Sequence, residues 1–188
     1  MNGSGFNKNA KSLPYGVELV HNSEYKVDMA HINDFSSRAS GSLGASQPSA
    51  AVLKMALERA GGVRSYIVPD ELSMESLIKF AGEWRSKRST QLSWQFIDDH
   101  KMLVELACST TLVPVYHPAL FDRMVPPSAG DTRCVVFIVC GGFKVSLSDT
   151  EEFRNIVGHA RRAPGANWEV RCDDGEIFKV PKRDVNEE

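Results

Sequence analysis

The chain has no surplus of basic residues and no long apolar run. Its 188 residues include 22 lysines and arginines against 24 aspartates and glutamates, so the formal net charge is −2. Nucleic-acid binding requires a basic face, and we therefore expect no nucleic-acid partner. No apolar run approaches the ~20 residues that cross a bilayer, and the polar residues 1–10 lack a signal-peptide core. We expect a cytoplasmic protein without a membrane partner.

Motifs of metal centres and of common catalytic sites are also missing. The cysteines form no CxxC pair and have no histidine at metal-ligand spacing, so we expect free thiols. The histidines form no HExxH motif, and the sequence contains neither a Gly-x-Ser-x-Gly elbow nor a Walker loop. Zinc enzymes, α/β-hydrolases and Walker-type nucleotide-binding proteins are therefore unsupported.

Helical and strand patterns alternate along the chain. The composition, 42% hydrophobic and 24% charged, is typical of a globular protein, and this length favours one domain. Residues 1–46 are mostly connecting chain with one strand over 16–20. Apolar spacing predicts a helix over 48–60, ended by two glycines. The elements predicted next are a strand over 64–68, a helix over 70–80, a strand over 101–105 and a helix over 108–124, limited by Pro114 and Pro118.

Residues 134–140 are the most hydrophobic stretch of the chain and end at Gly141 and Gly142. A continuous apolar run of this length predicts a central parallel strand buried on both faces. Ligands of open α/β sheets lie outside the carboxyl ends of the strands, where glycines allow close approach to the backbone. We expect this strand end and residues 104–111 to form the floor of one site.

The last part of the chain predicts a helix and a hairpin. Ser148 and Glu151 have capping-box spacing at a helix start. Residues 168–172 and 177–180 flank a turn sequence and predict a β-hairpin. The predicted fold class is therefore α/β, with a three-layer, open, mostly parallel sheet and a carboxyl-terminal β-hairpin.

Three motifs in order resemble the carboxyl-terminal half of L-serine dehydratases, with L-threonine dehydratases close by. They are Ser-Leu-Gly-Ala at 42–45, Asp-Asp-His-Lys-Met-Leu-Val-Glu-Leu-Ala-Cys at 98–108 and Ile-Val-Cys-Gly-Gly-Phe-Lys-Val-Ser-Leu at 138–147. The resemblance covers roughly residues 10–182 and implies part of the large domain of a fold type II, tryptophan-synthase-β-like enzyme that uses pyridoxal 5'-phosphate. It implies that residues 1–160 belong to this domain and that 161–188 form a tail with the hairpin.

The resemblance also implies roles for individual residues. Cys140 matches the thiol or hydroxyl that hydrogen-bonds the pyridine nitrogen of the cofactor, and Gly141 and Gly142 match the pair that lets the backbone pass close to the ring. Glu105 matches a carboxylate near the cofactor pocket, although a charge that caps the following helix explains it equally well. The carbonyls of Leu43 and Ala45 match ligands of a monovalent cation such as potassium.

The family's Schiff-base lysine, substrate loop, phosphate cradle and cation-binding glutamate belong to an amino-terminal half that this sequence does not contain. Lys144 follows the glycines but does not match the lysine motif. The complete enzyme, commonly a homo-oligomer, would deaminate L-serine to pyruvate, or L-threonine to 2-oxobutanoate, with release of ammonia. We expect this chain to be a fragment that is inactive by itself. Alternatives are a non-catalytic partner of a full-length dehydratase and a small-ligand-binding module.

Overall fold

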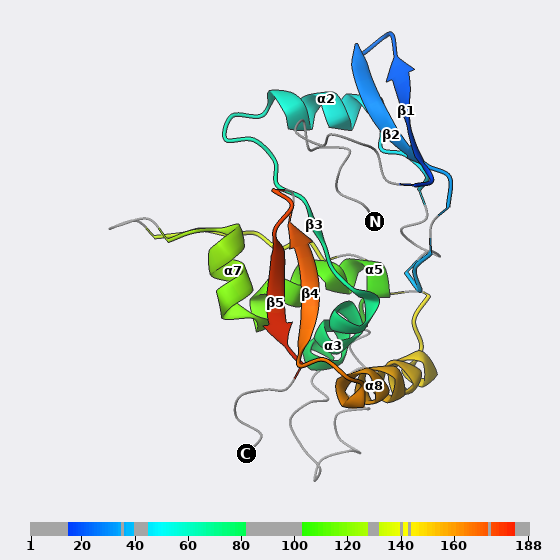
Figure 1. The fold of residues 1–188 in the computed structure, drawn as a ribbon, viewed down its shortest axis with the longest axis vertical. Helices are drawn as coiled ribbons and strands as arrows, with labels where there is room; N and C mark the ends of the chain where they lie inside the picture. The colour runs from blue at the N-terminus through cyan, green and yellow to red at the C-terminus, as the bar shows by residue number, and fades with distance from the viewer. Residues whose placement is uncertain are drawn as a thin grey trace. The chain divides into compact units, whose positions relative to one another are not determined.

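The computed structural model describes residues 15–34, 36–39, 45–81, 103–127, 132–139, 141–142, 144–172 and 174–182 (Figure 1). The chain divides into two compact units. The first comprises Met1–Ile67 with Val170–Phe178, and the second comprises Val68–Glu169 with Lys179–Glu188. Among the helices that the structure describes, none combines the length and the apolar character of a membrane span.

The first unit contains a hairpin and a helix that packs on it. Strands β1 (Val17–Asn22) and β2 (Val27–Ile32) pair antiparallel, with Val17 opposite Ile32. The predicted strand over 16–20 is confirmed as β1, whereas β2 falls in residues expected to be connecting chain. Helix α2 (Ala50–Glu58) confirms the predicted helix and packs on β2 through Leu53, which contacts Val27 and Met29. The hairpin forms because β2 buries apolar side chains against α2.

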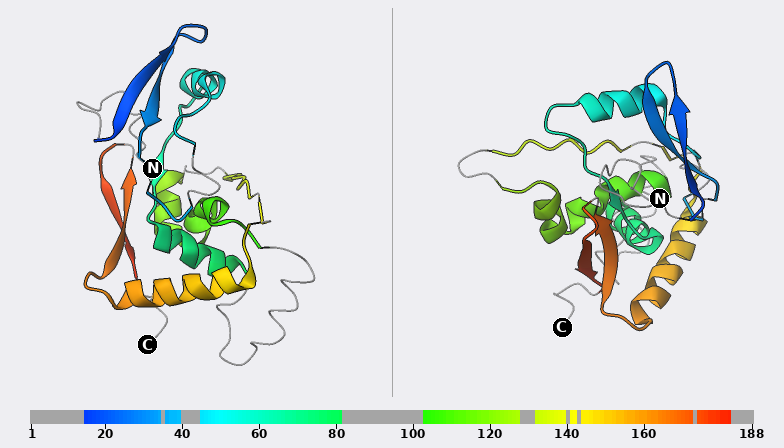
Figure 2. Two further views of the ribbon diagram at one scale, coloured as in Figure 1. Left: turned by 90° about the vertical axis from the view of Figure 1, so that its right-hand side faces the viewer. Right: turned by 45° about the horizontal axis from the view of Figure 1, so that its top comes forward.

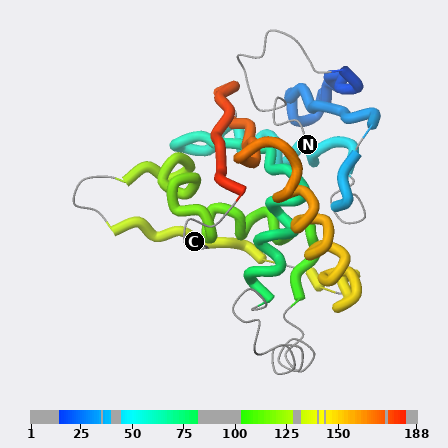
Figure 3. Tube along the Cα trace, turned by 60° about the horizontal axis from the view of Figure 1, so that its bottom comes forward, coloured from blue at the N-terminus to red at the C-terminus, as the bar shows by residue number. Residues whose placement is uncertain are grey.

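Helix α3 (Asp70–Phe80) lies at the centre of the second unit and has the bounds that the sequence predicted. Every residue from Leu72 to Ile78 is buried because the helix is covered on several sides (Figure 3). Its neighbours are α5 (Leu106–Ser109), η3 (Thr110–Leu112), α6 (Val113–Tyr116) and α8 (Leu147–Arg162). Leu77, Val104 and Leu112 form the core between them, with Phe153 of α8 packed against it.

The single helix predicted over 108–124 is wrong, because this stretch is divided into α5, η3, α6 and α7 (Pro118–Met124). His117, between α6 and α7, has φ −132° and ψ 83°, which are not helical angles. Pro118 begins α7, and the residue before a proline is disfavoured in the α conformation. Pro118 therefore limits the helix at His117, whereas Pro114 lies within α6.

Two predicted strands are also absent from the described residues. Residues 103–105 and 132–139 are neither helix nor strand, while 101–102 and 140 lie outside the described part. An apolar run becomes a strand only where neighbouring strands supply hydrogen bonds, and Val136 and Ile138 are instead 80% and 74% exposed. The recorded pairings of β1 with β2 and of β3 (Tyr66–Ile67) with β4 (Asn167–Cys172) are antiparallel. The three-layer parallel sheet stays a prediction.

The carboxyl-terminal hairpin is confirmed by β4 and β5 (Ile177–Pro181), which are neighbours in a sheet of order β3-β4-β5. Figure 2 shows β4 and β5 following the end of α8. β4 buries alternate residues, Trp168, Val170 and Cys172, as a half-buried strand does. The predicted domain boundary after residue 160 falls within α8 and stays a prediction.

Helix α8 begins with a capping box, but the predicted pair of Ser148 and Glu151 is wrong. Ser146 is the N-cap: its hydroxyl accepts from Asp149 N–H, and its own N–H donates to the Asp149 carboxylate at 2.7 Å. Ser146 and Asp149 have the same spacing as Ser148 and Glu151, two residues earlier in the chain. The spacing alone therefore could not distinguish the two pairs. Hydrogen bonds from the Ser146 hydroxyl and then from its backbone N–H hold the pKa of Asp149 below its ordinary value of 3.8.

We predict that Ser146→Ala destabilises the chain by about 1 kcal/mol and raises the pKa of Asp149, whereas Ser148→Ala costs less. Because the folded-state pKa of Asp149 is depressed, its contribution is present above the ordinary pKa and is lost as pH falls through the folded value. Urea unfolding from neutral to acidic pH should show this loss in the wild type and not in Asp149→Asn. Equal effects of the two serine variants would contradict the assignment of the cap.

Candidate functional site

Two segments of the second unit meet at the glycine pair. Leu103–Glu105 leads into α5, and Gly141–Gly142 precedes α8. Gly142 N–H donates to Glu105 Oε1 in a long contact of 3.5 Å. A Cβ at Gly141 would lie 2.9 Å from Glu105 Cδ, and a Cβ at Gly142 would lie 2.4 Å from the Leu103 carbonyl oxygen. The approach of a backbone atom requires glycine at position 142, whereas the neighbour of Gly141 is a flexible side chain. We call Leu103, Glu105, Gly141 and Gly142 the glycine contact.

Both glycines also have backbone angles that favour glycine. Their φ values are +86° for Gly141 and +148° for Gly142. Side chains with a Cβ rarely adopt this half of conformational space. The sequence placed Glu105, Gly141 and Gly142 at one site, and the structure brings these three residues together.

Glu105 is held in place by α3. Its backbone carbonyl accepts Ser109 N–H at 3.0 Å, and the Ser109 hydroxyl donates to Ser73 O at 2.8 Å. Ser73 Oγ and Thr110 Oγ1 are 3.0 Å apart. On either side of Glu105, Val104 and Leu106 are buried. These contacts hold the backbone of Glu105 in place, and its side chain extends toward the glycines.

Glu105 lies at the N-cap of α5 but makes no side-chain capping hydrogen bond there. The carboxylate instead faces Gly142 N–H across the glycine contact. The interpretation of Glu105 as a charge at the start of the following helix needs no such hydrogen bond, because a carboxylate at the N-cap can act on the helix dipole alone, so both interpretations stay predictions. The Glu105 carboxylate lies directly against the main chain of the glycine pair.

The other predicted site residues do not belong to the glycine contact as the structure describes it. Cys140 and Leu43 lie outside the described residues, and Ala45, which is exposed, belongs to the first unit. The proposed ligation of a monovalent cation by the carbonyls of Leu43 and Ala45 therefore stays a prediction. Lys144 is described and exposed.

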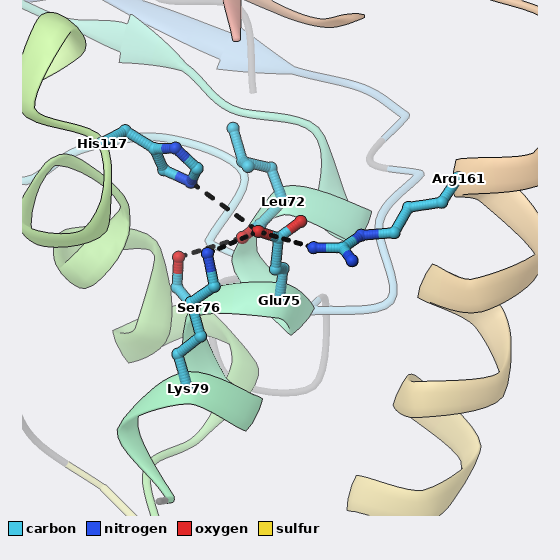
Figure 4. A network of polar contacts seen from close by, with 6 residues as sticks. All are labelled: Leu72, Glu75, Ser76, Lys79, His117 and Arg161. Atoms are coloured by element: carbon cyan, nitrogen blue, oxygen red, sulfur yellow. Dashed lines mark hydrogen bonds and ion pairs between the residues drawn. The ribbon is translucent and has the colours of Figure 1, made fainter. Parts of the chain in front are cut away.

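A second polar group, which we call the Glu75 cluster, was not predicted as a site. Figure 4 shows the side chains of Lys79, His117 and Arg161 directed toward the carboxylate of Glu75. Glu75 is 1% exposed, and its Oε1 lies 2.9 Å from Lys79 Nζ, 3.3 Å from an Arg161 guanidinium nitrogen and 4.0 Å from His117 Nε2. Among the described residues, Glu75 Oε2 has no hydrogen-bond partner.

The Glu75 cluster joins three parts of the second unit. Glu75 and Lys79 belong to α3, Arg161 to the last turn of α8, and His117 to the junction of α6 and α7. The i,i+4 spacing of Glu75 and Lys79 on a predicted helix was visible in the sequence. The approach of Arg161 and His117 to Glu75 was not visible in the sequence, because it depends on how the helices pack. The cluster connects α8, which follows the glycines, to α3, which packs against α5.

Comparison with known proteins gives one partial similarity. No family model matches the chain, and no solved structure matches it. Among curated proteins, the chain is similar over part of its length to an amino-acid dehydratase. That relative is the human L-serine dehydratase/L-threonine deaminase, which is 34% identical over 74 residues. The match covers 37% of this chain and 22% of the human protein, so the chain spans about a fifth of its relative's length.

Proposed function

We propose that this chain forms the ring-side part of the cofactor domain of a pyridoxal-phosphate-dependent L-serine or L-threonine dehydratase. The glycine contact is the observation that carries the proposal. It joins a carboxylate and two residues without side chains. The partial similarity to the human dehydratase supports the same assignment. The parallel sheet predicted from the sequence belongs to this proposal as the scaffold of the whole domain.

A flat heterocyclic ring would lie against the main chain of the two glycines. Leu103 and Glu105 already occupy the Cβ side of Gly142 and Gly141, so the ring would have to approach this main chain from another side. Cys140, which precedes them, would supply a thiol to the ring nitrogen, as the resemblance implies. A thiol does not hold that nitrogen protonated as a carboxylate would, and this suits elimination. When bound, the cofactor supplies the electron sink for loss of the substrate's α-proton and hydroxyl group.

The residues of this chain would position the glycines and the ring. The Leu103–Glu105 segment fixes the position of the glycines, because its carbonyl and carboxylate lie against them. Glu105 accepts the Gly142 N–H and keeps the turn before α8 in one conformation. No residue of this sequence matches the lysine that removes the α-proton. The proposed task of this chain is therefore to bind and orient the ring.

Binding of pyridoxine 5'-phosphate, which lacks the aldehyde, tests the proposal by equilibrium dialysis of the purified chain. We expect weak, saturable binding, because the analogue needs no lysine bond. Gly142→Ala should abolish the binding. Gly62→Ala is the matched control, since Gly62 also has a positive φ, +74°, but has nothing within 4 Å of its Cβ position. Absence of saturable binding to the wild type, or equal binding by both variants, would contradict the proposal.

Catalysis by the chain alone is expected to be absent. The purified chain, incubated with L-serine and pyridoxal phosphate, should form no more pyruvate than a heat-killed control. The reason is that the proposal gives this chain ring binding and no proton-abstracting lysine. Coupling to lactate dehydrogenase and NADH measures pyruvate directly. Turnover above the control would show that a residue of this chain replaces the missing lysine.

A further inference from the structure

Further contacts join the stretch around α5 to the residues that precede the glycine pair, and both segments belong to the second unit. The Val139 side chain packs against the core that includes Val104 and Leu112. The Thr111 hydroxyl donates to Ile138 O at 3.2 Å. These contacts and the glycine contact follow one another along the chain. The main chain that leads to the glycines is therefore held by the same stretch that holds the glycines.

The Thr111 hydroxyl has two acceptors within reach. Cys108 O, in the turn before it, lies 2.8 Å away, and Ile138 O, 27 residues later in the chain, lies 3.2 Å away. A hydroxyl has one proton, so the two carbonyls share it. The bond to Cys108 is local and usual for threonine, and it needs no further role. The bond to Ile138 is different, because it joins two segments that are distant in the sequence.

The main chain at Ile138 depends on this hydroxyl more than on its own side chain. The Ile138 side chain is 74% exposed, so burial does not fix its position. The carbonyl that Thr111 bonds lies only three residues before Gly141. A ring that lies against the glycine main chain needs this main chain in one position. Holding it there before the ligand arrives lowers the entropy cost of binding.

We propose that Thr111 is a positioning residue for the ring site. Its hydroxyl holds the main chain at Ile138, and through it the glycine pair, in the conformation that receives the ring. Thr111 acts through the main chain that it bonds and not through contact with the ring. The inference rests on the proposed function, because it takes the glycine contact as the ring site. The family resemblance assigns no role to Thr111, which is the last residue of the floor expected over 104–111.

Replacing Thr111 with valine or serine separates the hydroxyl from the shape of the side chain. Valine keeps the branched shape and removes the donor, whereas serine keeps the donor. In equilibrium dialysis, we expect Thr111→Val to bind pyridoxine 5'-phosphate about three- to tenfold more weakly than the wild type, the range of one lost neutral hydrogen bond. Thr111→Ala, which also lacks the donor, should weaken binding to a similar extent. Thr111→Ser should restore most of the affinity.

Thr132→Val is the matched control. It makes the same change at another exposed threonine, in the segment that leads to Ile138, and it should bind like the wild type. Thr111 is also exposed, so all variants should fold, and urea unfolding checks this. Equal binding by the wild type and Thr111→Val would overturn the inference and leave the proposed function intact. A wild type that does not bind would contradict the proposed function, and the inference would fall with it.

Chemical shifts of the ligand-free, isotopically labelled chain test the Thr111 contact without the cofactor. The carbonyl carbon of Ile138 and the amide of Val139 should shift in Thr111→Val, because the carbonyl loses its donor. Both signals should return toward their wild-type positions in Thr111→Ser and stay unchanged in Thr132→Val. Unchanged signals in Thr111→Val would overturn the inference even if binding weakens, since the loss would then come from the local bond to Cys108.

Discussion

Replacing Gly142 with alanine should destabilise the second unit by about 3 kcal/mol or more, because two independent costs add. The new Cβ would lie 2.4 Å from the carbonyl oxygen of Leu103, a backbone atom that cannot move without displacing the start of α5. The φ of +148° is also one that alanine rarely adopts. Urea unfolding followed by circular dichroism measures the loss.

Gly175→Ala is the matched control for this prediction. Gly175 has a positive φ, +86°, but nothing lies within 4 Å of its Cβ position. Its substitution should therefore cost only the conformational strain, about 1–2 kcal/mol. A Gly142 variant that is no less stable than the Gly175 variant would show that the close approach to Leu103 does not exist in solution.

Replacing Glu75 with alanine should destabilise the chain by about 3–5 kcal/mol, because it removes the shared carboxylate of a buried ionic cluster. Lys79 and Arg161, whose side chains are only 10% and 14% exposed, would both lose their contact with this carboxylate. Glu75→Gln should also destabilise, since the amide preserves the shape but not the charge. Chemical denaturation at neutral pH measures both variants.

Glu58→Ala is the control for the loss of a glutamate charge at an exposed position. Glu58 forms an i,i+4 pair with Lys54 at 3.8 Å, but its side chain is 67% exposed. Exposed pairs of this kind contribute about 0.5 kcal/mol or less. If the Glu75 and Glu58 variants lost similar stability, the cluster would not join α3 to α8 as the structure indicates.

Local sequence patterns predicted helix α3 and the carboxyl-terminal hairpin. Helix α3 was predicted with its bounds because its apolar residues recur at helical spacing after Pro69 and Asp70. The carboxyl-terminal hairpin was predicted from alternating residues around a turn. Strand β2 was missed because Val27 and Met29 are buried by packing against Leu53, a contact distant in the sequence.

The incorrect predictions concern segments whose conformation depends on contacts with residues distant in the sequence or on single backbone angles. The apolar run at 134–140 predicts a buried strand, yet burial requires strands on both sides, and Val136 and Ile138 are exposed. The interruption of the helix at His117 depends on the backbone angles of this residue. Apolar spacing does not specify such angles, so it could not predict the interruption. At the candidate site, the resemblance selected Glu105 and the two glycines, but the contact between Gly142 and Leu103 could be known only from the structure.

The central claim is that the glycine contact binds the ring of a pyridoxal-type cofactor. The most direct measurement is a titration of the isotopically labelled chain with pyridoxine 5'-phosphate, followed by amide chemical shifts. The proposal predicts saturable shifts of the Gly141, Gly142 and Glu105 amides, and smaller shifts for Gly62 and Gly175. Shifts that are absent at these three amides, or that are spread evenly over the chain, would contradict the claim.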